Sequence, residues 1–371
     1  MNRNATHESQ LQVCAACRDL DAELDFWTGT VGMQLREIYP ADSPRTAVVE
    51  GHGLRLRLQV QPDSHDSLRE LELLSDDPGW DRFRSTGMAS PGGVRVHLRP
   101  RQPVLSQPPT RQATVLTRAD ASAHWEVGRA GMRYRDLLPQ RHGGAFIASH
   151  IRIVEGGPLP DYVHHHAIRF QMIFCRTGWV RVVYEGQGEP FLMEPGDCVL
   201  QPPHIRHRVL ESSPGAEVVE IVTPAEHVTL TDSRMPLPSS HRLPSDHLFG
   251  GQRFVRHQAS HKEWEPWQSS GFDAQDTGIA VATQGLADVR TLRPNDRWND
   301  GVAQQQDAEF CLYYVLQGRM EVRIDDVSHV LEADDCLTLA SGQRYTLLPA
   351  GDDLRLLAVT LPARGAPRSC N

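Results

Sequence analysis

Short apolar runs separated by turn residues dominate the chain from its start to Ser75. The run Leu11–Cys17 is apolar and has the length of a strand, and Asp19 can cap a helix through Asp21–Thr30 that ends near Gly32. Three segments with alternating apolar residues follow, at Met33–Tyr39, Thr46–Glu50 and Leu54–Val60. This order predicts a βαβββ module over residues 1–75.

The rest of the chain has the hydrophobic pattern of a mainly β protein. Residues 76–118 and 233–262 are rich in Pro, Arg and Ser and are predicted to be linkers, the first with one strand at Val94–Leu98. Residues 119–232 and 263–371 contain short strands separated by Gly and Pro turns. The pattern therefore predicts two all-β domains after the module.

The two all-β domains are copies of one another. His164–Gly178 aligns without a gap on Gln304–Gly318, and Glu194–Leu210 aligns on Glu332–Leu348. The first offset is 304 − 164 = 140 and the second is 332 − 194 = 138, so the small difference falls in the turn between the paired segments. A repeat of this length in two copies indicates a duplicated domain.

Composition removes several classes of function. The chain has 371 residues and a net charge of −9, and its arginines form no basic tract, which argues against nucleic-acid binding. Lys262 is the only lysine, so Schiff-base chemistry has a single candidate amine. No apolar run reaches the roughly 18 residues of a membrane helix, and the N-terminus lacks the features of a signal peptide. We therefore expect a soluble, cytoplasmic protein that does not bind membranes.

Cysteine usage agrees with a reducing compartment. Seven cysteines in so long a chain are too few for a disulfide scaffold. Cys14 and Cys17 form a CxxC pair, but the chain has no second pair to complete a zinc site. We do not assign metal or redox chemistry to this pair.

Histidine gives a stronger lead, because 18 histidines are present. The segment HHH puts His164 and His166 on one face of a strand and His165 on the other. Gln171 follows five residues after His166, and His207 follows a Pro-rich turn. Three imidazoles and an amide oxygen in this spacing suit a divalent metal ion, the alternative being histidines that pack in a core or face solvent.

The second copy lacks these imidazoles. Its four equivalent residues are Gln304, Gln306, Cys311 and Tyr345. The flanking apolar pattern persists there, so the fold itself does not require the histidines. We therefore expect a metal site in the first β domain and a metal-free, structural second domain.

These motifs resemble those of the cupin family, and the chain is similar to a bicupin over roughly residues 120–365. The family's first motif is His-x-His, a carboxylate about five residues later and a glycine about seven beyond that; its second is a glycine, a proline and a histidine. The matching residues here are His164, His166, Gln171, Gly178, Gly196, Pro202 and His207. Gln171 replaces the usual glutamate, and His204 replaces a glycine. The resemblance implies two jelly-roll barrels.

The N-terminal module has a resemblance of its own. The segments RDLDAELDFWTGTVGMQL and GHGLRLRL are similar to one half of a glyoxalase/bleomycin-resistance (vicinal oxygen chelate) domain. Such domains pair two βαβββ modules around a metal, and the ligand positions that the resemblance implies hold Gln12 and Gln59 here. We therefore expect a structural or dimer-forming module.

The expected ligand set is electrically neutral, which leaves the full charge on a divalent ion and favours anionic chelating substrates. Fe(II) is our first choice of metal, and Mn, Ni, Cu and Zn also suit such a site. On a continuous strand Arg169 shares the inward face of Gln171 and can clamp a substrate carboxylate; an outward ion pair is the alternative. His204 is expected at the barrel mouth as an acid/base group, a spare ligand or a surface turn residue.

Three hypotheses for function follow. The first is an Fe(II) dioxygenase of a small carboxylated aromatic or enolic substrate, since AIRF (Ala167–Phe170) and MEPGD are similar to gentisate-type ring-cleaving bicupins. The second is a metal-dependent isomerase or lyase of a sugar acid, because cupins with three His and one Gln look alike at the ligand positions. The third is a non-catalytic cupin that binds a small molecule. We also expect a homodimer or higher homo-oligomer, as is common for cupins.

Overall fold

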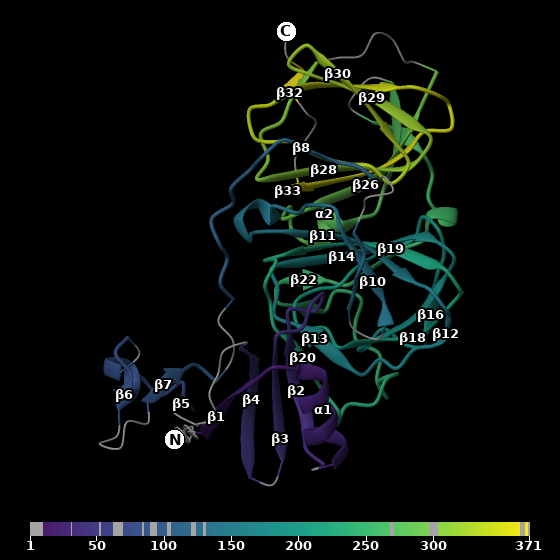
Figure 1. Ribbon diagram of the computed structural model, residues 1–371. Coiled ribbons are helices and arrows are strands. Elements are labelled where there is room, and N and C mark those ends of the chain that lie inside the picture. Colours follow the sequence, from purple (N-terminus) through teal and green to yellow (C-terminus); the bar gives the residue numbers. More distant parts are fainter. Residues whose placement is uncertain are drawn as a thin grey trace, which may run out of the picture. The chain divides into compact units, whose positions relative to one another are not determined.

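The computed structural model describes residues 10–30, 32–51, 53–61, 70–83, 85–89, 95–101, 105–119, 124–128, 131–267, 271–296, 303–363 and 368–369 (Figure 1). The chain forms two compact units. The first takes residues 1–106, 162–167 and 226–236, and the second takes 107–161, 168–225 and 237–371. No helix in the described part of the chain is long and apolar enough to cross a membrane. The six cysteines that lie in it are free thiols.

A β-sheet with a short helix on one face forms most of the first unit. The helix α1 (Leu20–Leu24) begins after Asp19, whose carboxylate accepts a hydrogen bond from the Ala22 N–H at 3.0 Å, and continues as a π-helical turn, Asp25–Thr30. The strands of the βαβββ order are β1 (Gln10–Cys17), β2 (Gln34–Tyr39), β3 (Thr46–Gly51) and β4 (Leu54–Val60). The described elements thus follow the predicted β-α-β-β-β order.

The sheet of this unit is larger than the βαβββ module. Its strand order is β20-β2-β3-β4-β1-β5-β7-β6, with β13 beside β20. The added strands are β5 (Glu70–Leu74), β6 (Met88–Ala89), β7 (Arg95–Arg99), β13 (His164–His166) and β20 (Thr229–Thr231). The stretch 76–118, expected as a linker with one strand, carries that strand as β7; Val94 lies outside the described residues. It also holds a 3-10 turn at Pro78–Phe83, β6 and β8 (Val115–Thr117).

Two β-barrels make up the second unit. The first has a sheet in the order β23-β17-β14-β19-β11-β10-β9 and a second group, β16-β15-β18, with β12 paired to β18. Its strands are β9 (Glu126–Val127), β10 (Arg133–Asp136), β11 (Ile147–Ile153), β12 (Gly157–Pro158), β14 (Phe170–Thr177), β15 (Val180–Tyr184), β16 (Phe191–Met193), β17 (Cys198–Leu200), β18 (His207–Ser212), β19 (Ala216–Thr223) and β23 (Val255–His257). A hairpin of β21 (Leu248–Phe249) and β22 (Gln252–Arg253) precedes β23.

The second barrel has the orders β24-β25-β26-β33-β28-β31-β8 and β30-β29-β32-β27-β34. Its elements are β24 (Glu265–Pro266), β25 (Phe272–Asp276), α2 (Ile279–Ala282), β26 (Asp288–Pro294), β27 (Gln304–Gln305), β28 (Phe310–Gln317), β29 (Arg319–Ile324), β30 (Val327–Glu332), β31 (Cys336–Thr338), β32 (Arg344–Pro349), β33 (Arg355–Leu361) and β34 (Arg368–Ser369). Mainly antiparallel pairing in two sheets confirms the predicted mainly β fold.

The duplication seen in the sequence is reproduced strand for strand. β14 pairs with β19, and the register shifts between Cys175 and Thr177. β28 pairs with β33, and the register shifts between Val315 and Gln317, which are the equivalent residues of the second copy. A β-bulge at the same position in both copies shows that the two barrels share backbone detail as well as strand order.

Each barrel contains a strand from the segment that precedes the other barrel in the sequence. β8, which comes before the first barrel, pairs with β31 of the second, and β23, which comes before the second barrel, pairs with β17 of the first. The two segments predicted as linkers therefore complete the sheets of the barrels. This exchange ties the two barrels to one another.

The two large sheets share one hydrophobic core, and they lie face to face in Figure 1. Alternate residues of β14 and β28 contribute to it, namely Phe170, Met172, Phe174, Phe310, Leu312 and Tyr314. The residues between them face the barrel interiors, as Cys175 does in the first barrel and Tyr313 in the second. Gln171 lies in the same alternation as Cys175, so the period of two places it on the inward face of the first barrel.

Candidate metal centre

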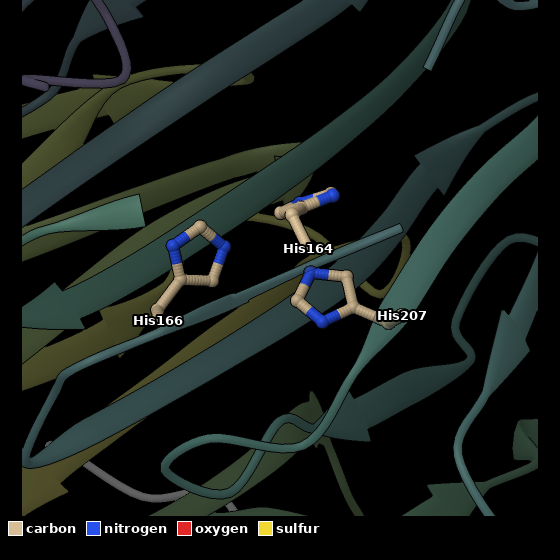
Figure 2. A group of neighbouring side chains, drawn as sticks. All are labelled: His164, His166 and His207. Atoms are coloured by element: carbon tan, nitrogen blue, oxygen red, sulfur yellow. The ribbon is translucent and has the colours of Figure 1, made fainter. Parts of the chain in front are cut away.

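The three histidines of the two motifs come from β13 and β18. β13 consists of three consecutive histidines, of which His164 and His166 are 0% and 5% exposed while His165 is half-buried. This alternation is the one that the sequence predicts. His207 is the first residue of β18 and is 5% exposed. Figure 2 shows the three imidazole rings gathered around one point.

The spacing of the rings suits a shared cation. Each of His164, His166 and His207 offers one ring nitrogen, and these atoms all lie within 4.8 Å of one another. Two nitrogens bound at right angles to one ion, each about 2.1 Å away, are about 3 Å apart. In the described part of the chain this is the group of His, Cys, Asp and Glu side chains that fits a metal ion.

Hydrogen bonds at Nδ1 orient all three imidazoles. Nδ1 of His164 lies 2.7 Å from the carbonyl oxygen of Tyr162, and Nδ1 of His207 lies 3.0 Å from that of Ile205, two residues earlier in each case. Nδ1 of His166 lies 3.0 Å from Oγ1 of Thr229, on the paired strand β20. A proton on Nδ1 in each ring leaves the lone pair on Nε2, which is the tautomer that a metal ligand needs.

Gln171 lies on β14 and is 2% exposed. Its Nε2 donates a hydrogen bond to Oε1 of Glu220 at 2.7 Å, and its Oε1 has no hydrogen-bond partner among the described residues. The amide is therefore oriented with its oxygen away from the Glu220 carboxylate. A metal bond to that oxygen stays a prediction.

Two further residues lie near the site, and neither belongs to a motif of the sequence. The ring of Tyr184, from β15, stacks on His207 with centroids 5.5 Å apart. Burial, followed by the neighbouring Cys198 and Glu220, raises the pKa of Tyr184 far above its ordinary value, so its hydroxyl stays protonated. The signal that could have found Glu220 is a carboxylate between the apolar residues Val219 and Ile221 of the strand AEVVEIVT.

Arg169 is held by an ion pair to the second barrel. β13 ends at His166 and β14 begins at Phe170 in a different sheet, so no continuous strand carries Arg169 to the inward face of Gln171. Its Nη1 lies 3.1 Å from Oε2 of Glu309. This is the outward ion pair that the sequence leaves open as an alternative; contact of Arg169 with a substrate stays a prediction.

His204 lies in the turn that precedes β18 and is exposed. Its φ of 65° is in the left-handed region, which glycine adopts without a steric penalty. The glycine that the cupin motif has at this position thus fits a backbone requirement that His204 meets at some cost. A role of His204 as an acid/base group or a ligand stays a prediction.

The equivalent positions of the second barrel are filled by packed side chains. Tyr345 stands in place of His207, and its hydroxyl lies 2.9 Å from that of Tyr313. Both tyrosines and Cys311 belong to the apolar interior of this barrel. The side chain of Gln306 forms two hydrogen bonds with the backbone of Ala308, both at 2.9 Å: its Oε1 accepts from the N–H and its Nε2 donates to the carbonyl oxygen.

Comparison with known proteins places the fold. No protein-family model matches the chain, and no curated protein matches its sequence. Among solved structures, the chain is similar to protein Ylba from E. coli (TM-score 0.51, 10% identity, 71% of this chain and 96% of that chain). It is also similar to an oxalate decarboxylase variant from B. subtilis (TM-score 0.50, 14% identity, 71% and 81%). These likenesses identify the fold as that of bicupins.

Proposed function

We propose that the protein is a metal-dependent enzyme whose ion is held by His164, His166 and His207. The observation that carries this proposal is the convergence of three buried imidazoles, each oriented by a hydrogen bond at Nδ1. The equivalent positions of the second copy hold Gln304, Gln306 and Tyr345, so the shared fold does not require buried imidazoles at these places. The three-histidine site is therefore proposed as the catalytic one, and the second barrel, which lacks these histidines, as a structural domain.

The proposed reaction is dioxygenation of a small carboxylated aromatic or enolic substrate with Fe(II) in the site. His164, His166 and His207 would hold the ion, and Fe(II) would supply Lewis acidity and redox chemistry toward O₂ for an anionic chelating substrate. The chain itself fixes the imidazoles, and the apolar interior of the barrel lowers the local dielectric, which strengthens the attraction of an anionic substrate.

A redox-neutral isomerase or lyase of a sugar acid is the second candidate. One solved structure similar to this chain is that of an oxalate decarboxylase from B. subtilis with Mn(II) centres (TM-score 0.50, 13% identity), an enzyme named for a small dicarboxylate. The same three imidazoles can hold Mn(II), with the ion acting as a Lewis acid. A non-catalytic cupin that binds a small molecule is the third outcome of the test below.

Metal analysis of the purified protein, combined with oxygen uptake during a screen of aromatic and sugar acids, separates these candidates. Stoichiometric iron with O₂ consumption supports the dioxygenase, whereas turnover without O₂ supports the isomerase or lyase. Bound metal with ligand binding and no turnover supports the non-catalytic cupin.

The site assignment is tested by His207→Ala, with His241→Ala as the control because His241 is an exposed histidine of the second linker. We expect His207→Ala to weaken metal binding by at least about a hundredfold, beyond the ~10–100-fold effect of an outer hydrogen-bond partner. His241→Ala should bind metal as the unaltered protein does. Retention of metal and activity in His207→Ala contradicts the assignment.

A further inference from the structure

The sheet of the N-terminal module has an apolar and a charged face. Leu56 and Leu58 of β4 pack with α1 in the apolar core. The alternating residues Arg55 and Arg57 point to the opposite face, because side chains of a strand alternate with a period of two. Polar residues of the neighbouring strands join them on this face, including Gln12 of β1 and Glu72 of β5, which are direct partners in the register.

This charged face is hollowed into a pocket of about 410 Å³. Four arginines line it, namely Arg55, Arg57, Arg99 and Arg101, with two carboxylates, Glu37 and Glu72. Four guanidinium groups thus surround one small cavity, although the chain as a whole has a net charge of −9. The hydroxyl of Tyr39 adds a neutral hydrogen-bonding group.

The polar groups of the pocket are ordered by contacts with one another. Gln12 accepts a hydrogen bond from Nε of Arg55 at 2.7 Å and donates one to Oε2 of Glu72 at 2.8 Å. Arg57 and Arg99 both contact the Glu72 carboxylate, at 3.3 and 3.4 Å. The amide of Gln12 thus uses both its oxygen and its nitrogen within the network, so this residue orders the pocket instead of holding a metal.

The lining of the pocket has an excess of positive charge and a buried hydrogen-bond donor that the network does not use. Arg55 pairs with Glu37, and Glu72 is shared by two arginines, so the lining contains two more cations than carboxylates. Burial raises the pKa of Glu37. Nε of Arg57 is buried and has no acceptor among the described residues. A buried donor without an acceptor costs free energy, which an incoming oxygen atom recovers.

We propose that this pocket binds a small molecule through a carboxylate or phosphate group. Guanidinium groups recognise both anions through paired N–H donors, and their attraction is strong in a partly desolvated cavity. Arg57 and Arg101 are the residues that contact the anion, and Gln12 and Glu72 hold the guanidinium groups in place. The alternative is a self-contained ion-pair network that stabilises the sheet without binding anything.

Calorimetric titration of the full chain with inorganic phosphate and with malonate, at constant ionic strength, tests the proposal. We expect a dissociation constant below about 10 mM for at least one anion. Stronger binding of phosphate identifies a phosphate ester as the ligand class, and stronger binding of malonate identifies a carboxylate. Absence of binding by either anion overturns the proposal.

Variants localise the binding. Arg57→Gln should weaken it by about tenfold or more, as expected for loss of a charge-assisted hydrogen bond. Arg101→Gln, at an exposed position, should weaken it severalfold. Arg95→Gln is the matched control, since Arg95 pairs with Glu70 in the same sheet and lies outside the pocket lining.

An anion bound to a metal at the three histidines is not affected by Arg57→Gln or Arg101→Gln, so the two sites are distinguished. Equal binding in Arg101→Gln and the unaltered protein contradicts the proposal. Equal weakening in Arg95→Gln contradicts it as well, because it indicates general attraction to the surface.

Discussion

The choice of glutamine at position 171 has a physical explanation in its neighbour. Nε2 of Gln171 donates to the Glu220 carboxylate at 2.7 Å, so a glutamate at position 171 places two carboxylates in contact inside the barrel. Like charges at this distance repel, and one of the two groups must take up a proton. The pair Gln171 and Glu220 supplies one amide and one carboxylate where the usual cupin motif supplies a carboxylate in the motif itself.

We expect Gln171→Glu to lower the free energy of unfolding of the metal-free protein by about 1–3 kcal/mol, because it replaces a hydrogen bond with a repulsion. The double variant Gln171→Glu/Glu220→Gln restores one amide and one carboxylate and should recover most of the loss. Urea denaturation of the metal-free proteins measures both. Equal stability of the single variant and the unaltered protein, or no recovery in the double variant, contradicts this explanation.

The sequence predicts some residues of the candidate site better than others, and the reason is the range of the interactions. His164 and His166 follow from strand alternation, which is local, and His207 follows from its place after the Pro-rich turn of the second motif. The environment of Arg169 could not be predicted from the sequence. The chain is not in a strand between His166 and Phe170, and the ion-pair partner Glu309 belongs to the other barrel. Glu220 carries no motif, and its importance appears only once β19 lies beside β14.

At the scale of helices and strands, the sequence predicts the features that depend on local contacts and not those that depend on distant ones. The helix cap at Asp19 and the order of strands in the βαβββ module are local features and are confirmed. The pairing of β8 with β31 and of β23 with β17 joins segments that are distant in the sequence, and no hydrophobic pattern in either segment indicates its partner. The face shared by the two barrels is equally non-local, although the alternation in β14 and β28 predicts that both of its sides are apolar.

This shared face should carry much of the stability of the two barrels. Phe146 is fully buried in it and stacks on Phe310 with ring centroids 4.4 Å apart and planes inclined by 16°. Phe146→Ala should lower the free energy of unfolding by about 3–5 kcal/mol, because it opens a cavity between the two sheets. Leu192→Ala is the control, since Leu192 is 43% exposed on β16, and should change it by no more than about 0.5 kcal/mol. Denaturant unfolding measures both, and a loss below about 1 kcal/mol for Phe146→Ala contradicts the expectation.

At the scale of the whole molecule, a charged network extends from the first barrel to the second. Glu217 of β19 lies 2.7 Å from Nε of Arg152, 2.8 Å from Nη1 of Arg176 and 3.1 Å from Nε2 of His150. Arg176 also pairs with Asp334, which belongs to the second barrel. Although burial opposes ionisation, the hydrogen bonds and charges of His150, Arg152 and Arg176 lower the pKa of Glu217 to about 2.

A lowered pKa of this kind makes stability depend on pH in a defined direction. The ordinary pKa of Glu217 is 4.5, so its contribution is complete above that pH and is lost as the pH falls from about 4.5 toward 2. We expect Glu217→Gln to lower the free energy of unfolding by on the order of 2 kcal/mol at pH 7, with the difference from the unaltered protein shrinking below pH 4.5. Glu332→Gln, which removes an exposed ion pair with Arg319, should run parallel to the unaltered protein. Urea unfolding at a series of pH values tests this, and a difference that stays constant down to pH 3 contradicts a role of Glu217 in joining the barrels through its charge.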